Sequence, residues 1–497
     1  MADYDPLVVL PALLPLIGVP LTLAIAPRRR LQSVVALAVL AAALGAGLVL
    51  LRQVLHGNAA AVVQLGGWPA PFGVTLIADP LSALLVVMSL GVLLAGFVYA
   101  LGSGDACVRA GAFAPLFLAI AAGLCGAFLT GDLFSLFVFA ELVVIAGTVL
   151  TSLSDDSAGA EAALKYFYMS LLASTFLLLA CGAMYVAYGT LNMADLAARI
   201  AAHPGAPAAA LGLAFLIAAF MIKSAVVPFH FWQPDFHSAA PTAVSAMLSS
   251  VVVKLGVYGL IRVTTLLFLP QAGSVRALLV SLGVAGILYG GLAAAGTHNA
   301  KRMLAYSTLA QVGFILVAVG WGTAGALLAA LVFTVNHSLI KAALFMLSGA
   351  LVSRAPVKSA DFAVLEGVGR TTPAIGAMFL VAGLALAGVP PTAGFVSKLV
   401  LFQSGIGASR YAALGVVALL SALTLVYVAR SYLRLFREPA ADGRRAKPRG
   451  DSLLAPTVLV VAVILFGLWP GPLFAAAASA AEWLLEPGAY VRAVLGG

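Results

Sequence analysis

The sequence predicts an all-α polytopic membrane protein with about 14 transmembrane helices. Hydrophobic residues make up 63% of the 497 residues and charged residues only 9%, and the mean hydropathy is +1.11. Soluble domains carry about 25% charged residues, so this composition indicates a chain that lives in lipid. Apolar runs follow one another along the whole sequence and leave no space for a soluble domain. We therefore expect residues 1–497 to form a single membrane domain.

The individual helices are predicted from runs long enough to cross a bilayer. A helical span needs about 20 mainly apolar residues. Runs of this kind begin near Leu7, Leu31, Leu81, Ala112, Leu133, Leu164, Leu211, Thr242, Ala277, Met303, Gly325, Thr372, Tyr411 and Leu453.

The basic residues collect in alternate loops, as the orientation rule for membrane proteins requires. If the first loop is cytoplasmic, that side receives most of them, including Arg28, Arg109, Lys301, Arg302, Arg354, Lys358, Arg444, Arg445 and Lys447. The opposite side receives only Arg52, Arg199, Arg262, Arg276, Arg410 and Arg492. We therefore expect a multi-pass protein of the cell inner (plasma) membrane with both termini outside. The net charge of +9 follows from this orientation and does not indicate a nucleic-acid partner.

A few titratable residues lie where charge is costly. Lysines occur at the edge of or inside apolar runs, and Glu141 is the one acidic residue in the middle of such a run; the lysines are Lys165, Lys223, Lys254, Lys341 and Lys398. An ionisable residue at membrane depth normally marks an ion path. Buried lysine and glutamate can titrate near neutral pH, whereas arginine stays charged. The pattern predicts a protein that moves protons, or cations coupled to protons.

Motifs for other chemistry are missing from the sequence. Cys107, Cys125 and Cys181 lie far apart and form no metal-binding spacing. No P-loop, dinucleotide fingerprint or nucleophile elbow occurs. We predict no metal, no cofactor and no redox centre, so the energy must come from an ion gradient or a partner.

Prolines interrupt two apolar runs close to a lysine. Pro228 and Pro234 follow Lys223, and Pro390 precedes Lys398. Backbone groups freed at membrane depth survive only inside protein or around a cavity. Interruptions at corresponding positions of two halves point to a transport site built from repeats. The spacing of the two lysines indicates roughly five helices per repeat.

Several segments resemble one family. They are GDLFSLFVFAEL, KSAVVPFHFWQPDFHSAAPTAVSAMLSSVVVKLGVYGLIR, KRMLAYSTLAQVGF, NHSLIKAALF and GVPPTAGFVSK. In this order they are similar to the antiporter-like subunits of Mrp cation/proton antiporters, respiratory complex I and membrane-bound hydrogenases. The resemblance implies helices 1–3 in residues 1–110 and two inverted five-helix repeats, helices 4–8 in 111–266 and helices 9–13 in 275–437. Helices 7 and 12 would be broken, and residues 438–497 would hold a cytoplasmic loop, helix 14 and a short tail.

The resemblance also implies roles for single residues. Glu141 matches the family's essential glutamate and Lys223 its partner lysine. Lys254 matches the lysine of the central axis, and Lys398 the lysine of the exit half. His337 and Lys341, four residues apart on one helix face, match the bridge between the halves. Independently of the family, Glu141 and Lys223 could hold each other charged if their helices touch.

Structural roles compete with these functional ones. The ordinary pKa of histidine, ~6.5, suits His337 to proton relay, but a hydrogen-bonded structural histidine is the alternative. Lys341 could snorkel or cap carbonyl groups near a helix end. We expect Lys165 to snorkel at the cytoplasmic end of its helix.

The break in helix 7 holds three more polar residues, His230, Asp235 and His237. They could give cytoplasmic access to Lys223, or they could fix the loop by hydrogen bonds. Before helices 5 and 3, Asp132 and Asp79 are predicted to cap the helix amino ends.

Two branches of the family remain open. The segments GGWPAPFGVTLIADPLSALL and YGTLNMADLA, with the overall length, are most similar to the D subunit of Mrp antiporters, whereas PFHFWQPDFHSAAP is more similar to complex I or hydrogenase membrane arms. A purely structural scaffold would be expected to have lost ionisable positions, and all are present. The expected partners are other membrane subunits of a hetero-oligomeric complex. The transported ions would be protons, with Na⁺ as a further candidate that no residue specifies.

Overall fold

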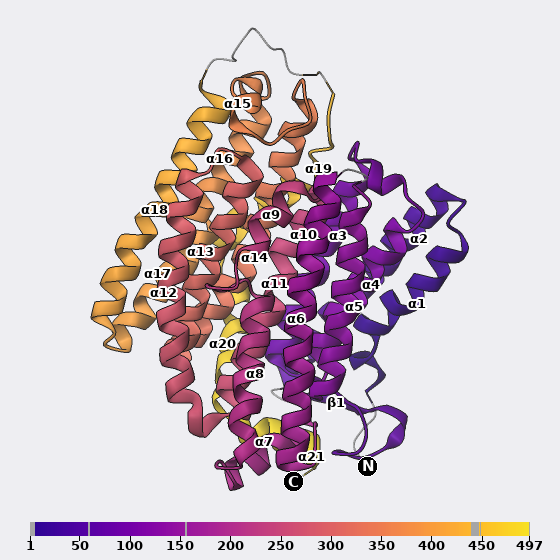
Figure 1. Cartoon of the computed structure of the whole chain (residues 1–497), viewed down its shortest axis with the longest axis vertical. Coiled ribbons are helices and arrows are strands. Elements are labelled where there is room, and N and C mark those ends of the chain that lie inside the picture. Colours follow the sequence, from indigo (N-terminus) through magenta and orange to yellow (C-terminus); the bar gives the residue numbers. More distant parts are fainter. Residues whose placement is uncertain (1–4, 58–59, 155–156, 439–446, 448, 497) are drawn as a thin grey trace.

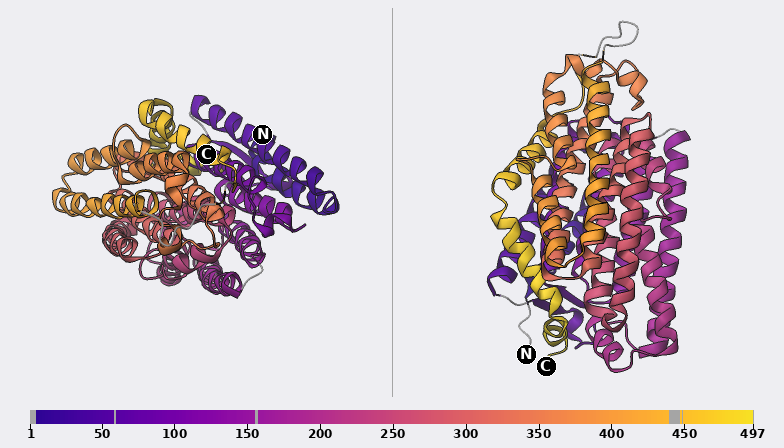
Figure 2. Two further views of the ribbon diagram at one scale, coloured as in Figure 1. Left: turned by 90° about the horizontal axis from the view of Figure 1, so that it is seen from above. Right: turned by 90° about the vertical axis from the view of Figure 1, so that its left-hand side faces the viewer.

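The computed structural model describes residues 5–57, 60–154, 157–438, 447 and 449–496. Long helices run roughly side by side along the long axis of the molecule (Figures 1 and 2). Both ends of the chain lie at one end of this bundle, here called the terminal face, and α15 (Phe362–Leu365) lies at the other end, here called the loop face. Arg444 and Arg445, which the charge pattern assigns to the cytoplasm, lie outside the described residues.

The amino-terminal part consists of η1 (Pro6–Val8), α1 (Leu10–Ala24), α2 (Arg29–Gly57) and α3 (Pro80–Leu101). A short antiparallel hairpin of β1 (Ala61–Gln64) and β2 (Thr75–Ala78), with η2 (Leu65–Gly67) in its loop, precedes α3 on the terminal face. This hairpin is not predicted from the apolar runs. Asp79 caps α3 as expected, because its side chain accepts a hydrogen bond from the Ser82 N–H at 2.8 Å.

The two regions in which repeats are predicted are here called the first and second repeat regions. The first contains α4 (Phe113–Leu129), α5 (Leu133–Ser152), α6 (Ser157–Tyr188), the short α7 (Met193–Ala202), α8 (Pro207–Lys223) and α9 (Trp232–Ala239), after η3 (Ala106–Arg109). One continuous helix follows as α10 (Thr242–Met247), η4 (Leu248–Val252), α11 (Val253–Arg262) and η5 (Val263–Leu267), in which η4 and η5 are π-helical. Asp132 caps α5 by accepting from Ser135 N at 2.7 Å. Helix 7 is broken between α8 and α9, where Pro228 cannot continue the helix.

The second repeat region begins after η6 (Leu269–Gln271) and contains α12 (Ala272–Gly296), α13 (Ala300–Trp321), α14 (Ala324–Arg354), α15, η7 (Val368–Thr371), α16 (Pro373–Ala387), α17 (Ala393–Gly407) and α18 (Tyr411–Phe436). Helix 12 is broken between α16 and α17, around Pro390 and Pro391. The chain ends in α19 (Leu454–Leu468), α20 (Gly471–Leu485) and α21 (Pro487–Leu495).

The fold class is all-α and polytopic, as predicted. Of the described helices, 9 are long and apolar enough to cross a membrane, or up to 11 if two bent pairs count as spans. Helix length therefore does not reproduce the count of 14. The physical reason is that α1, α4 and α8 are short apolar helices of 10–17 residues and that helix 12 is divided by its prolines.

The interior of the bundle is formed by the helix Thr242–Leu267, which is fully buried, with α13 and α14 around it. By contrast, α18 and α2 are mostly exposed. Close packing of α12 on α13 depends on small residues, since a Cβ at Gly290 would lie 2.7 Å from the Tyr306 carbonyl oxygen.

The charge pattern is wrong about Arg262. The structure buries it within the central helix. Burial is possible because Asp79 forms an ion pair with it, whereas an arginine in an exposed loop needs no such partner.

Candidate functional site

The acidic end of the site joins α5, α6 and α8. Ser174 of α6 lies between the two predicted partners, donating a hydrogen bond to Glu141 Oε1 and accepting one from Lys223 Nζ at 3.3 Å. Within the described part of the chain, Glu141 and Lys223 form no direct ion pair. A small cavity of about 20 Å³ beside Lys223 has room for about one water. The predicted pair is thus connected through a hydroxyl group.

The centre of the site lies where α11 meets α14. Lys254 Nζ is 2.9 Å from His337 Nδ1, and both side chains are buried. The π-helical turn η4 precedes Lys254, and such turns often occur at functional positions. Its Ser249 carbonyl lies 3.4 Å from Lys254 Nζ. Lys254 and His337 are therefore a direct contact between the two repeat regions.

Lys341 does not lie near a helix end, contrary to the sequence-based alternative of capping or snorkelling. It is fully buried in the middle of α14. Its ammonium group donates to the Leu304 carbonyl at 2.5 Å and to the Ser307 hydroxyl, both on α13. His337 and Lys341 thus share a face of α14 but contact different helices.

Lys398 lies in α17, just beyond the second break. Its Nζ donates to the Ala387 carbonyl at 2.8 Å and to Ser421 Oγ at 2.6 Å. Ala387 is the last residue of α16, so its carbonyl has no partner further along that helix. Lys398 Nζ also lies 5.1 Å from the centre of the Phe314 ring. The break thus supplies an oxygen ligand to a buried ammonium group.

A further small cavity connects the centre with Lys398. Its volume is about 10 Å³, and both His337 and Lys398 line it, together with Gln311 and Ser397. The other ring nitrogen, His337 Nε2, has no hydrogen-bond partner among the described residues. The volume is close to that of a single water site. One water here would connect His337 with Lys398. The polar groups that follow one another from Glu141 to Lys398 are here called the row.

The three candidate access residues have separate surroundings. Asp235 accepts from Lys165 at 2.9 Å and from Arg302 at 2.5 Å, so it ties α9 to α6 and α13. His230 packs against Tyr289 with a ring separation of 4.3 Å. His237 is fully buried, and its ring lies 5.2 Å from Phe345.

The places of His230 and His237 indicate which lysines they could serve. Among the described residues, neither histidine lines the cavity beside Lys223. The Phe345 ring that contacts His237 also lies 5.8 Å from Lys341 Nζ. His237 therefore lies toward the central lysines. Lys165 is at the edge of its span and partly exposed, with ion pairs to Glu161 and Asp235.

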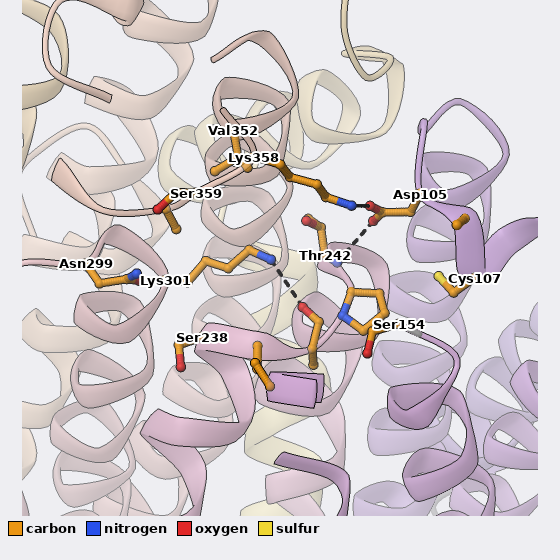
Figure 3. A pocket seen from close by; sticks show the side chains of 16 residues that line it. Asp105, Cys107, Ser154, Ser238, Thr242, Asn299, Lys301, Val352, Lys358 and Ser359 are labelled. Carbon is orange, nitrogen blue, oxygen red and sulfur yellow. Dashed lines mark hydrogen bonds and ion pairs between the residues drawn. The ribbon is translucent and has the colours of Figure 1, made fainter. Parts of the chain in front are cut away.

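A cavity of about 270 Å³ opens on the loop face, beside the turn between α9 and α10 (Figure 3). Ser238, which follows His237, lines it together with Thr242 and Lys301. Lys301 Nζ donates to the Ala240 carbonyl at 3.2 Å. Lys358 Nζ is 2.7 Å from Asp105 Oδ1, and Figure 3 shows Lys301 and Lys358 reaching into the same space.

The charges of this loop-face cavity stabilise one another. Burial favours the neutral acid, but the hydrogen bond and charge of Lys358 hold the pKa of Asp105 below its usual value. Conversely, burial favours neutral lysine, but the hydrogen bond and charge of Asp105 raise the pKa of Lys358. Among the described residues, no group of three or more His, Cys, Asp and Glu side chains could hold a metal ion.

Sequence reasoning missed several residues that join the titratable groups. Ser174, Ser307 and Ser421 each contact a buried lysine. Serine is common in membrane helices and gives no charge signal, so nothing in the sequence singles these positions out. Arg262 could have been found, because it follows Lys254 on the same apolar helix.

Comparison with known proteins identifies the family of the chain. Residues 130–424 match the family model described as NADH:quinone oxidoreductase/Mrp antiporter, TM. The D subunit of the Na(+)/H(+) antiporter of Bacillus subtilis is 31% identical, over 98% of this chain and 99% of that protein. The N subunit of the NADH-quinone oxidoreductase of Desulforudis audaxviator is 36% identical, over 87% of this chain and 89% of that protein.

A solved structure has the same fold. One chain of the Mrp complex from Dietzia sp. superposes with a TM-score of 0.91 and 28% identity, covering 99% of both chains. The match covers the helices that hold the row from Glu141 to Lys398 and the helices on either side of them. The chain belongs to the NADH:quinone oxidoreductase/Mrp antiporter transmembrane family.

Proposed function

We propose that this chain is a proton-translocating subunit of a multisubunit membrane complex, of the kind represented by the D subunit of Mrp cation/proton antiporters. The observation that carries the proposal is the buried row of titratable groups. It runs from Glu141 through Ser174 to Lys223, continues at Lys254 and His337, and ends at Lys398. Lys223 and Lys398 come from the two broken helices and Lys254 from the fully buried helix between them. Glu141 and His337 come from α5 and α14.

The groups divide the work by their chemistry. Glu141 can hold Lys223 protonated through Ser174, and loss of that contact would favour release of the proton. Lys254 can pass a proton directly to His337, which also lines the cavity shared with Lys398. Lys341 lies on the same helix face and biases this transfer by its charge. Lys398 is the exit carrier.

A membrane subunit of a complex I-like or energy-converting hydrogenase enzyme is the second candidate. The 36% identity to an N subunit favours it, as does the segment PFHFWQPDFHSAAP. The nearly full-length matches to a D subunit and to the Mrp complex chain favour the first candidate. Both candidates place the chain beside other membrane subunits, and both move protons. Na⁺ is the cation that we propose to be coupled in the first case.

The proposal includes the arrangement in the membrane. Residues 111–266 and 275–437 form the two inverted repeats, and the loop face is cytoplasmic, so both termini are outside. A single cysteine introduced at Ser359, beside Lys358, should react with a membrane-impermeant reagent only from the cytoplasmic side. Labelling from outside in intact cells would reverse the orientation.

The test of function is the variant Glu141→Gln in the assembled complex. The amide keeps the shape of the side chain and removes its titration, so we expect ΔpH-linked ion exchange in membrane vesicles to be lost while assembly is retained. Glu161→Gln on α6 is the matched control, because Glu161 is exposed and, among the described residues, its ion-pair partner is Lys165. Near-normal exchange by an assembled Glu141→Gln complex would contradict the proposal.

A further inference from the structure

A buried ion pair lies at the terminal-face end of the central helix. Arg262 Nη2 is 2.6 Å from Asp79 Oδ2, and their side chains are only 3% and 0% exposed. Arg262 also donates to Ser82 Oγ at 3.1 Å. The family resemblance assigns no role to this pair, and the row from Glu141 to Lys398 does not use it.

Three segments hold the Arg262 side chain in place. Its guanidinium carbon lies 5.1 Å from the ring centre of Tyr258 and 5.1 Å from that of Tyr490. Tyr258 precedes it by one turn on α11, and Tyr490 comes from α21 near the end of the chain. Stacking between aromatic rings and a paired carboxylate suits arginine in particular. The positive charge is therefore fixed in position.

Arg262 lies between the central lysine and the terminal face. It follows Lys254 by eight residues within α11, which places it about 12 Å further along the helix at 1.5 Å per residue. Asp79 precedes α3 beside the terminal-face hairpin, so it lies on the far side of Arg262 as seen from Lys254. A proton leaving Lys254 straight toward the terminal face would thus meet the guanidinium first.

Arginine cannot serve as a step in a proton relay, because it stays protonated at every working pH. A fixed positive group in a narrow path also repels protons and other cations. Lys254 meanwhile has His337 within 2.9 Å as an alternative partner.

We propose that Arg262 is a fixed positive barrier that closes the first repeat toward the terminal face, so that a proton on Lys254 passes to His337 instead of leaking across the membrane. Asp79 is the positioning residue that keeps this charge buried and oriented. The inference rests on the proposed function, since it assumes that Lys254 carries protons.

The test is passive proton leak in liposomes that contain the reconstituted complex and no coupled cation. A potassium diffusion potential of either sign drives protons, and a trapped dye reports the internal pH. The double variant Arg262→Gln/Asp79→Asn removes the barrier without leaving an unpaired buried charge, which single removal would do. We expect it to leak at least about tenfold faster than wild type, because the positive end of the ion pair no longer faces Lys254. Adding Lys254→Met should abolish that leak.

Two further variants keep the test decisive. Arg262→Lys retains the charge and the partner but can release its proton, so its leak should rise with pH. The control Arg199→Gln/Asp195→Asn neutralises an ion pair on α7, away from the row, and should not leak. A proton leak as slow as that of wild type in the assembled Arg262→Gln/Asp79→Asn complex would contradict the proposed barrier. So would a fast leak that Lys254→Met does not reduce. The proposed function is tested separately, by measuring coupled ion exchange in the Glu141→Gln complex.

Discussion

The two broken helices use the same device with different partners for the lysine. In the first repeat region, Lys223 ends α8 and reaches a carboxylate through Ser174. In the second, Lys398 lies inside α17 and is held by the carbonyl of Ala387 and the hydroxyl of Ser421. Within the described part of the chain, no carboxylate pairs with Lys398. A carboxylate stabilises a protonated lysine more strongly than neutral oxygens do, so Lys223 and Lys398 differ in how firmly their surroundings hold the proton.

The ends of the two regions differ in a similar way. The arginine–carboxylate pair at the terminal face, Arg262 with Asp79, is almost completely buried. A second pair, Arg434 with Glu366, lies toward the loop face, where it is about one-fifth exposed and stacks on Phe362 at 5.0 Å. The two pairs thus lie toward opposite ends of the molecule. The Arg262–Asp79 pair is the more strongly shielded from water.

The largest effect is expected where the two regions meet. Among the described residues of the row, Lys254 and His337 form the one direct contact between titratable groups of the two repeat regions. Lys254→Met removes this contact. We expect exchange to fall to the level of vesicles without the complex, while assembly is retained because methionine fills the same space. His337→Gln should lose most of the activity as well. Strong exchange in either assembled variant would mean that the two regions work independently.

Removal of the hydroxyl group that contacts the lysine should have a larger effect in the first region than in the second. Ser174→Ala removes the only described link between Glu141 and Lys223, so exchange should fall about tenfold, as for loss of a hydrogen bond to a charged group. Ser421→Ala leaves the Ala387 carbonyl on Lys398, and a loss of about threefold or less is expected. Initial rates of ΔpH-linked exchange compare them. Equal losses of exchange in the two variants would show that the Ala387 carbonyl does not compensate for the lost Ser421 hydroxyl group.

A much smaller effect is expected at the edge of the first region. Lys165 is partly exposed, and its ion pairs with Glu161 and Asp235 are of the surface kind, which contribute about 0–1 kcal/mol. Lys165→Ala should therefore leave most of the exchange activity. If it were as damaging as Lys223→Ala, uptake would have to pass through Lys165, and the snorkelling interpretation would be wrong.

The smallest effect concerns stability and pH. The pKa of Asp105 is lowered, so its ion pair stabilises the folded state above the ordinary carboxyl range and loses that effect as pH falls through the lowered pKa. The pKa of Lys358 is raised, so the same pair fades as pH rises above the ordinary lysine range. Asp105→Asn should lower the melting temperature slightly at neutral pH, by the equivalent of about 0.5 kcal/mol, and not at acidic pH. A difference that grows toward acid would contradict this.

Much of the fold follows from the sequence, because apolar runs and prolines determine helices and their breaks locally. The positions of Glu141, Lys223, Lys254 and Lys398 were also predictable, since charge in an apolar run is rare. Their contacts were not. Ser174 and Ser421 act through three-dimensional proximity, and a hydroxyl group leaves no mark on the hydropathy pattern.

Long-range partners explain the remaining differences. Arg262 looks like an external loop residue until Asp79, from a segment far earlier in the chain, is brought beside it. Lys341 looks close to a helix end because the sequence does not reveal that α14 continues to Arg354. The hairpin before α3 is too short to predict from its alternation of residues.

The most direct test of the central claim, that the lysines of the broken helices carry protons, is ΔpH-linked exchange by the reconstituted complex with Lys223→Arg or Lys398→Arg. Arginine keeps the positive charge and cannot release a proton. We predict that each assembled arginine variant is nearly as inactive as the corresponding alanine variant. Substantial exchange in either one would show that the charge alone suffices there, and would contradict the relay through that lysine.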